Sequence, residues 1–208
     1  MGDEYGFTAK IYDPLFYVAL NSIRKAVMKE LTDHRDANIL DLCCGTGNQL
    51  KMLSKNGFSN LHCLDLSEPM LKIARRGAHS LVIHKEDAAK TGFEDNEFDI
   101  VILSFALHEK NRKTQENILR EVYRVMKDDG SMIVVDFIFD ERSIGLGRLG
   151  AIFIERMAGG EHYLNFKRYK KSGGLSAIID RKMFRNVKNI RKAFTVVTIS
   201  TYRKSENS

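Results

Sequence analysis

The sequence predicts an α/β domain in which helices cover both faces of a mostly parallel sheet. Between residues 38 and 139, short apolar runs of strand length alternate with segments that have apolar residues at helical spacing. This alternation is typical of parallel sheets. A glycine loop, Gly45-Thr-Gly47, separates the first strand from the first helix of the series. With 208 residues, the chain has the size of one domain.

The N-terminal segment is predicted to be an amphipathic helix that follows a loose arm over residues 1–10. Asp13 is a good capping residue and Pro14 suits the first helical turn. Apolar residues then recur at helical spacing as far as Leu31. The helix is therefore expected to end near Thr32.

The core elements follow in order from residue 38. Each apolar run is bounded by turn residues, and each helix begins near a polar residue that can cap it. The predicted strands are 39–42, 61–65, 81–84, 98–104 and 131–139, and the predicted helices are 48–57, one that begins at Ser67, and 113–127.

Beyond residue 139 the alternation weakens. The segment 143–158 has helical spacing but contains three glycines, which disfavour a regular helix. A basic, aromatic helix is predicted over 162–171 and another helix over 175–184. A weak strand at 187–190 and an alternating strand at 194–202 are expected to pair.

The strand, glycine loop and helix at 39–50 predict a nucleotide-binding site. Glycine lets the backbone turn tightly and approach a ligand, and Asp65 lies 20 residues beyond Gly45, where such folds place the acid that binds a ribose. Leu50 is too bulky for the third small position of a dinucleotide fingerprint. Asp41 would repel a pyrophosphate but attract an amine or sulfonium. The loop therefore favours a positively charged nucleoside ligand.

Four motifs resemble those of class I S-adenosylmethionine-dependent methyltransferases. They are Asp41-x-x-Cys-Gly-x-Gly47, Leu64-Asp-Leu-Ser-x-x-Met-Leu71, Glu86-Asp-Ala88 before Phe93–Asp99, and Leu119–Gly130 before a strand. The resemblance spans roughly residues 36–140. It implies a Rossmann-like, seven-stranded, mostly parallel sheet whose closing hairpin includes an antiparallel strand. Residues 1–35 would form an N-terminal helical lid, 36–140 the cofactor-binding core, and 141–208 a lid insert and the closing strands.

The resemblance also implies which residues bind S-adenosylmethionine. Asp65 would hold the ribose hydroxyls and Asp41 would lie under the methionine end, with buried or loop-capping acids as the structural alternatives. Asp87 and Ala88 would face the adenine. The whole expected set is Asp41, Cys43, Gly45, Thr46, Gly47, Asp65, Leu66, Met70, Asp87, Ala88, Ser104, Phe105 and, from the N-terminal helix, Tyr12.

On the acceptor side, His108 is the candidate general base, because it follows the fourth strand at the ligand-binding edge of the sheet and imidazole titrates near neutral pH. A structural hydrogen bond is the alternative role. Asp136, His162 and Tyr163 are weaker candidates. Methyl transfer needs no nucleophilic triad, and no metal-binding pattern is predicted.

The function that follows is methyl transfer to a small molecule at a C, O or N atom. The region after residue 139 loosely resembles quinone-biosynthesis C-methyltransferases, which does not define the acceptor. Residues 141–208 contain 15 Lys and Arg but 5 Asp and Glu, so an RNA methyltransferase is an alternative. A non-catalytic cofactor-binding relative is another.

The three cysteines, Cys43, Cys44 and Cys63, match no zinc or disulfide framework and are expected to be free thiols. No apolar run is long enough for a transmembrane helix, and the first residues do not resemble a secretory signal. The protein is therefore expected to be cytoplasmic. Its oligomeric state is not defined by the sequence.

Overall fold

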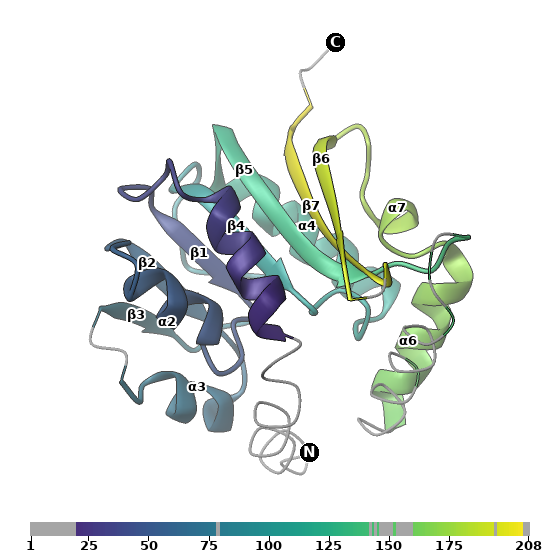
Figure 1. Cartoon of the computed structure of the whole chain (residues 1–208), viewed down its shortest axis with the longest axis horizontal. Helices are drawn as coiled ribbons and strands as arrows, with labels where there is room; N and C mark the ends of the chain where they lie inside the picture. The colour runs from purple at the N-terminus through teal and green to yellow at the C-terminus, as the bar shows by residue number, and fades with distance from the viewer. Residues whose placement is uncertain are drawn as a thin grey trace.

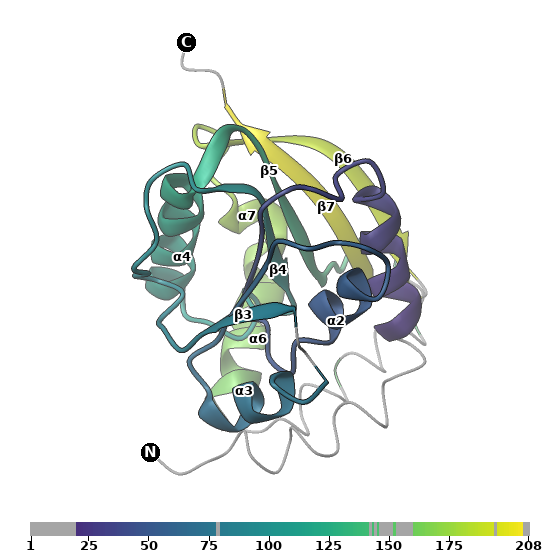
Figure 2. The ribbon, with the colours of Figure 1, turned by 90° about the vertical axis from the view of Figure 1, so that its left-hand side faces the viewer.

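A seven-stranded sheet forms the centre of the protein. The computed structural model describes residues 20–77, 80–141, 143, 145, 152, 160–193 and 195–205. The strand order is β3-β2-β1-β4-β5-β7-β6, and helices lie on both faces of the sheet (Figure 1). Viewed from the side, α4 lies on one face, and α2 and the helix over residues 20–30 lie on the other (Figure 2).

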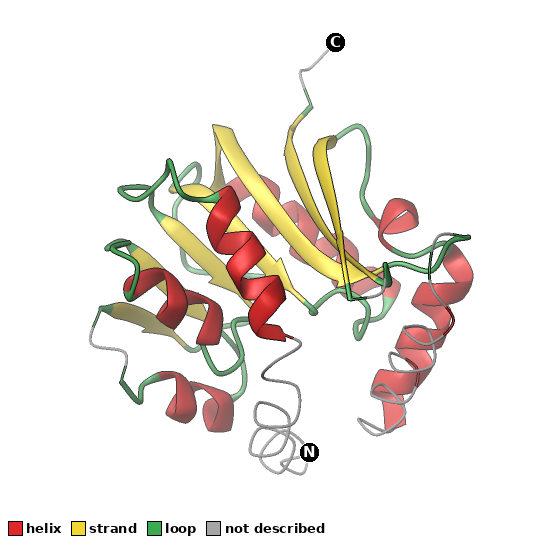
Figure 3. Ribbon diagram, viewed as in Figure 1, coloured by secondary structure: helices red, strands yellow, loops and turns green. Residues whose placement is uncertain are grey.

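The first five strands run parallel and the sheet ends in an antiparallel hairpin (Figure 3). Strand β7 pairs antiparallel with both β5 and β6. The expected seven-stranded sheet with an antiparallel strand in its closing hairpin is confirmed. The strands are β1 (Ile39–Leu42), β2 (Leu61–Leu64), β3 (Leu81–His84), β4 (Phe98–Ser104), β5 (Met126–Phe137), β6 (Phe184–Lys192) and β7 (Val197–Lys204).

The helices have the apolar stripes that the sequence predicts. The core is formed by the central strands, whose side chains are buried on both faces, together with Val27, Leu53 and Val122 from the covering helices. Burial on both faces explains why these strands are continuous apolar runs. The helices are α2 (Asn48–Ser54), α3 (Glu68–Ala74), α4 (Arg112–Val125), α6 (Gly160–Ser172) and α7 (Leu175–Ile178), and residues 20–30 are also helical.

The boundary between α4 and β5 differs from the prediction. The helix was expected to reach Lys127 and the strand to begin at Ser131. Instead Met126 has extended backbone angles, φ −79° and ψ 134°, and pairs with Phe98 of β4. The buried Met126 side chain fits either a helix or a strand, so its spacing alone does not distinguish them.

The helix expected over 175–184 is one turn long, and β6 is longer than expected. Ile179 has extended backbone angles, and Asp180 Oδ1 accepts a hydrogen bond from the Lys182 amide. Such Asx turns compete with helical hydrogen bonding. The chain then enters β6 at Phe184.

Several expectations concern residues outside the described ranges. These are the loose arm over 1–10, the helix start at Asp13 and Pro14, and most of the glycine-containing segment 143–158. The helix over 20–30 and the basic helix α6 do lie where the sequence predicts them.

Candidate functional site

The loop between β1 and α2 turns through left-handed backbone conformations. Cys43, Gly45 and Gly47 have φ values of 66°, 53° and 69°. A Cβ atom at Gly47 would lie 3.2 Å from the Ala74 Cβ atom, whereas no described atom lies within 4 Å of a Cβ atom built at Gly45. Gly47 is therefore needed for packing against α3, and Gly45 leaves open space beside the loop.

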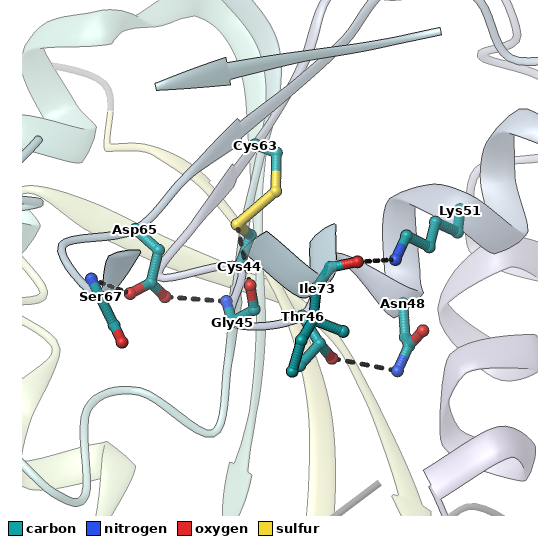
Figure 4. Close-up of a disulfide and its surroundings, with 9 residues drawn as sticks. All are labelled: Cys44, Gly45, Thr46, Asn48, Lys51, Cys63, Asp65, Ser67 and Ile73. Atoms are coloured by element: carbon teal, nitrogen blue, oxygen red, sulfur yellow. Dashed lines mark hydrogen bonds between the residues drawn. A yellow bond between two sulfur atoms is a disulfide. The ribbon is translucent and has the colours of Figure 1, made fainter. Parts of the chain in front are cut away.

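Asp65 holds this loop in place (Figure 4). Its Oδ2 atom accepts a 2.8 Å hydrogen bond from the Gly45 amide, and its Oδ1 atom accepts one of 2.8 Å from the Ser67 amide. Burial raises the pKa of Asp65, and these two amides act in the opposite direction. Each carboxylate oxygen has a second lone pair for another donor. Asp65 can therefore both organise the loop and bind hydroxyl groups.

Asp41 is a buried acid with unused hydrogen-bonding capacity. It is 2% exposed, and its Oδ1 atom has no hydrogen-bond partner among the described residues. Burial and the charge of Asp65 raise the pKa of Asp41 to about 7, against the opposing effect of Arg24. A buried carboxylate oxygen without a donor is unfavourable. This position therefore suits a cationic ligand group that donates a hydrogen bond.

The expectation that all three cysteines are free thiols is wrong. Cys44 and Cys63 form a disulfide beside the loop (Figure 4), and Cys43 is free. Parallel pairing brings the ends of β1 and β2 together: Asp41 is opposite Cys63, and the Cys44 amide donates to the Leu64 carbonyl. Cys44 and Cys63 are 19 residues apart in the sequence, and this separation alone does not show that they lie close together.

The other residues expected near a nucleoside lie along the same edge. Leu66 follows Asp65 and is 66% exposed, which is unusual for a leucine and leaves its side chain available for a ligand. Met70 of α3 is half-buried. Asp87 is exposed and its Oδ1 atom accepts a hydrogen bond from the Ala89 amide, while Ala88 is buried. Asp87 therefore shapes the turn after β3.

The Thr46, Ser104 and Phe105 positions complete this edge. The Thr46 hydroxyl accepts a hydrogen bond from the Asn48 side-chain amide at the start of α2. Ser104 is the last residue of β4, and Phe105 follows with a φ of 55°. The Phe105 amide donates to the Val135 carbonyl, which directs the chain across the end of β5. Tyr12 lies outside the described residues.

His108 forms a buried pair with Asp136. The imidazole is 3% exposed, and its Nδ1 atom lies 2.6 Å from Asp136 Oδ1. The His108 amide also donates to Asp136 Oδ2, at 3.2 Å. A carboxylate in this position fixes the orientation of the ring and favours the tautomer with the proton on Nδ1. Both roles considered for His108, structural hydrogen bonding and proton transfer, use this geometry.

Aromatic rings enclose this pair. The rings of Phe137, Phe166, Tyr169 and Phe105 have centroids 5.0, 6.0, 6.1 and 6.4 Å from that of His108. Phe139 and Tyr163 extend the cluster toward the surface, since both stack on its members and are partly exposed. Phe137, Phe166 and Tyr169 are buried and pack edge to face on the imidazole, so they shield the His108–Asp136 pair from water.

Sequence reasoning missed the charged residues after His108. Glu109 pairs with His162, whose Nδ1 atom lies 3.1 Å from the Glu109 carboxylate. Burial alone would raise the pKa of Glu109, but the hydrogen bond from His162 and the charge of Lys110 lower it to about 2. Lys110 acts electrostatically on both Asp65 and Cys43. Lys110 lies in the loop between β4 and α4, at the ligand-binding edge of the sheet. This position was the signal in the sequence that could have identified it. His162 and Asp136 are thus pairing partners for the loop after β4.

No group of three or more His, Cys, Asp or Glu side chains within the described ranges is arranged to hold a metal ion. None of the helices in those ranges has the length and apolar composition needed to cross a bilayer.

Residues 39–130 match the family model of the methyltransferase domain. The chain is similar to a demethylmenaquinone methyltransferase of Listeria welshimeri, with 34% identity over 120 residues that cover 54% of this chain and 50% of the relative. A Staphylococcus saprophyticus relative of the same name is 35% identical over 118 residues, with the same coverage. The chain thus spans about half the length of the curated relatives it matches.

Solved structures share the fold. A putative S-adenosylmethionine-dependent methyltransferase from Methanococcus maripaludis has a TM-score of 0.68 at 15% identity and covers 100% of this chain and 97% of its own. The magnesium protoporphyrin IX methyltransferase of Synechocystis has a TM-score of 0.65 at 18% identity, with coverage of 90% and 84%. The methyltransferase-domain match over residues 39–130 and the shared fold support the resemblance to class I S-adenosylmethionine-dependent methyltransferases.

Proposed function

We propose that this protein transfers a methyl group from S-adenosylmethionine to a small aromatic acceptor of the quinol type. The observation that carries the proposal is the buried His108–Asp136 pair inside a cluster of aromatic rings. His108 follows β4, the strand next to β1 and its glycine loop, and Asp136 lies near the end of β5. Proton-transfer groups and a nucleoside site would therefore share one edge of the sheet.

The residues present fit the cofactor. The bound cofactor supplies an activated methyl group on a sulfonium. Asp65 would accept hydrogen bonds from the ribose hydroxyls, and Gly45 leaves room for close approach. The Oδ1 atom of Asp41, which has no hydrogen-bond partner within the described part of the chain, would accept a hydrogen bond from the ammonium of the methionine portion. Leu66 would cover one side of the adenine.

The acceptor side performs orientation and proton transfer. Aromatic walls from Phe105 and Phe137 would hold a planar ring and exclude water, which is a large part of what methyl transfer requires. With its Nδ1 proton directed to Asp136, the His108 imidazole would use Nε2 to take the proton from an acceptor hydroxyl or ring carbon. Asp136 would stabilise the resulting imidazolium.

Two further observations support a small acceptor over RNA. The similar relatives are named for demethylmenaquinone, which is a small-molecule acceptor. Part of the basic charge in the last third is paired within the protein: Lys188 with Glu30, Arg191 with Asp140 and Lys204 with Asp128, at 2.7, 2.5 and 2.9 Å. These lysines and arginines have structural roles that require no phosphate.

The test is methyl transfer to a reduced naphthoquinol that lacks the ring methyl group, with an isotope-labelled cofactor and mass detection of the product. His108→Asn is expected to lower kcat by roughly 100-fold, since general-base catalysis contributes about that much. Affinity for S-adenosylhomocysteine should remain near that of the wild type. The matched control is His34→Asn, in the exposed turn after the helix over 20–30. If His108→Asn kept full turnover across the pH range, the role of His108 as general base would be rejected.

An RNA titration at two salt concentrations separates the alternative function. Binding through several phosphates is tight and weakens steeply with salt. Salt-sensitive binding together with label transfer into RNA would overturn the small-acceptor proposal. Cofactor binding without label transfer to any acceptor would indicate a non-catalytic relative.

The pKa of Asp41 predicts that cofactor binding depends on pH. A cationic ligand favours the ionised carboxylate, so affinity for S-adenosylhomocysteine is expected to increase between about pH 6 and about pH 7.5 as Asp41, with a pKa of about 7, loses its proton. In the ligand-free protein, loss of the Asp41 proton lowers the stability of the fold, whereas it raises the affinity for the ligand. Because the folded state retains this proton above the ordinary aspartate pKa, the contribution of Asp41 to the free energy of unfolding falls as pH rises through about 7.

Calorimetry over this pH range measures the effect, and Asp41→Asn is the control because it cannot ionise. The wild type should lose affinity at low pH, whereas Asp41→Asn should bind weakly with little pH dependence. Equal pH profiles for the two proteins would show that Asp41 does not face the ligand.

A further inference from the structure

A cavity lies against the β6–β7 hairpin, beside α7. Its volume is about 640 Å³, within the range of roughly 300–1,000 Å³ found for small-molecule sites. We propose that this cavity binds a small molecule that has an apolar body and an anionic head group. The proposal is independent of methyl transfer.

The cavity is separate from the cofactor site. Asp41 and Asp65 follow β1 and β2, whereas the cavity is lined by β6 and β7 at the other end of the sheet. Two strands, β4 and β5, lie between β1 and β7. Since neighbouring strands are about 4.8 Å apart, β7 is about 14 Å from β1. One small ligand at the glycine loop would therefore not fill this cavity.

One side of the cavity is apolar. Leu175 and Ile179, from α7 and the residue after it, and Phe184, at the start of β6, line it and are buried. The Phe184 ring packs edge to face on Tyr123 of α4, with centroids 5.7 Å apart. This wall is therefore fixed by packing on α4, and it suits the apolar body of a ligand.

Another part of the lining is a hydrogen-bonded row of polar side chains along the hairpin. The Thr198 and Ser200 hydroxyl oxygens lie 2.9 Å apart. Tyr202 forms side-chain hydrogen bonds with Ser200 and with Asn186. Asn189 then donates to Asn186 Oδ1 at 2.6 Å. These groups hold one another in place, and such preorganisation lowers the entropic cost of binding a polar ligand.

The charge of the lining selects an anion. Three arginines, Arg181, Arg185 and Arg191, contribute to the walls, and none of the described lining residues is acidic. Asp140 holds Arg191 through a 2.5 Å ion pair outside the lining. Arg181 is exposed at the turn that leads into β6. A cavity with this excess of positive charge and ordered hydroxyl donors favours a carboxylate or phosphate head group.

Phenyl phosphate tests both halves of the proposal, with phenol and inorganic phosphate as probes for each half alone. NMR titration of the full chain should give saturable shifts at the Leu175, Ser200 and Tyr202 amides. Phenol and phosphate should each bind about 10-fold more weakly, and Arg181→Gln should weaken phenyl phosphate binding by about 10-fold. Thr198→Val should weaken it similarly. The control is Arg203→Gln, which removes an exposed hairpin arginine that does not line the cavity and should leave binding unchanged.

Three results would overturn the proposal. Absence of saturable shifts at the hairpin would do so, as would equal losses in Arg181→Gln and Arg203→Gln, which would indicate general charge attraction. Shifts confined to the Gly45–Asp65 region that disappear with S-adenosylhomocysteine would place the probe in the cofactor site. Because Arg181 is exposed, its replacement tests binding even if Thr198→Val destabilises the fold. A failure of methyl transfer would not change the interpretation of any of these binding results.

Discussion

Asp65→Ala is expected to lower affinity for S-adenosylhomocysteine by at least about 10-fold, and by up to about 100-fold. Hydrogen bonds to a charged group contribute roughly 1.5–3 kcal/mol, which corresponds to that range of affinity. The substitution also removes the acceptor for the Gly45 and Ser67 amides, so the loop itself should become less ordered. Calorimetry measures the affinity, and circular dichroism checks that the domain remains folded.

Two control variants separate ligand contact from loop order. Asp65→Asn keeps one oxygen that can accept the Gly45 amide but removes the charge, so it should have an intermediate affinity. Asp129→Ala removes an exposed acid near the start of β5, at the opposite edge of the sheet, and should bind as the wild type does. If a folded Asp65→Ala variant retained full affinity, the assignment of Asp65 to the ribose would be rejected.

Gly47→Val is expected to lower the free energy of unfolding by roughly 2–5 kcal/mol. The left-handed conformation costs an ordinary residue roughly 1–2 kcal/mol, and crowding a packed region costs roughly 1–3 kcal/mol more. The new Cβ atom would lie 3.2 Å from Ala74 Cβ and 3.4 Å from the Cys63 sulfur. For a chain of this size the melting temperature should fall by about 5–15 °C, as measured by calorimetric unfolding.

Gly45→Ala is the matched variant, because Gly45 has a φ of 53° and no described atom within 4 Å of the added Cβ atom. It should incur the backbone cost alone, roughly 1–2 kcal/mol. Relative to this loss of stability, its loss of ligand affinity should be larger than that of Gly47→Val. Equal losses of stability in the two variants would show that the contact with α3 is unimportant.

The sequence was sufficient to predict the part of the fold that local patterns determine. Buried parallel strands are continuous apolar runs, and the acid at Asp41, the glycine loop and the acid at Asp65 have spacings that follow from one strand–helix–strand unit. The boundary at Met126 could not be predicted, because an apolar residue between a helix and a strand fits both. The length of β6 was underestimated because its exposed face is polar.

Side-chain pairing across the sheet was beyond the sequence. The disulfide joins Cys44 and Cys63 because β1 and β2 are neighbours, and the buried pair of His108 and Asp136 forms because β4 and β5 are neighbours. Strand order is a tertiary property that apolar periodicity does not encode. The candidate residues were therefore identified singly, and their partners became apparent only in the folded chain.

The polar, basic character of β6 has a consequence for the behaviour of the protein at high concentration. This strand is the outer edge of the sheet, and an edge strand presents unpaired backbone groups to which a strand from another copy could add. Its sequence contains Arg185, Lys188, Arg191 and Lys192 and no acid, and its pairing with β7 shifts register between residues 186 and 188. Glu30 and Asp140 offset the charges of Lys188 and Arg191, but the strand still has more positive than negative charge. Like charges on two such edges repel, and an irregular edge is a poor template for strand addition. The positive charge of β6 thus disfavours strand addition by a second copy of the chain, and this effect weakens as salt screens the charges.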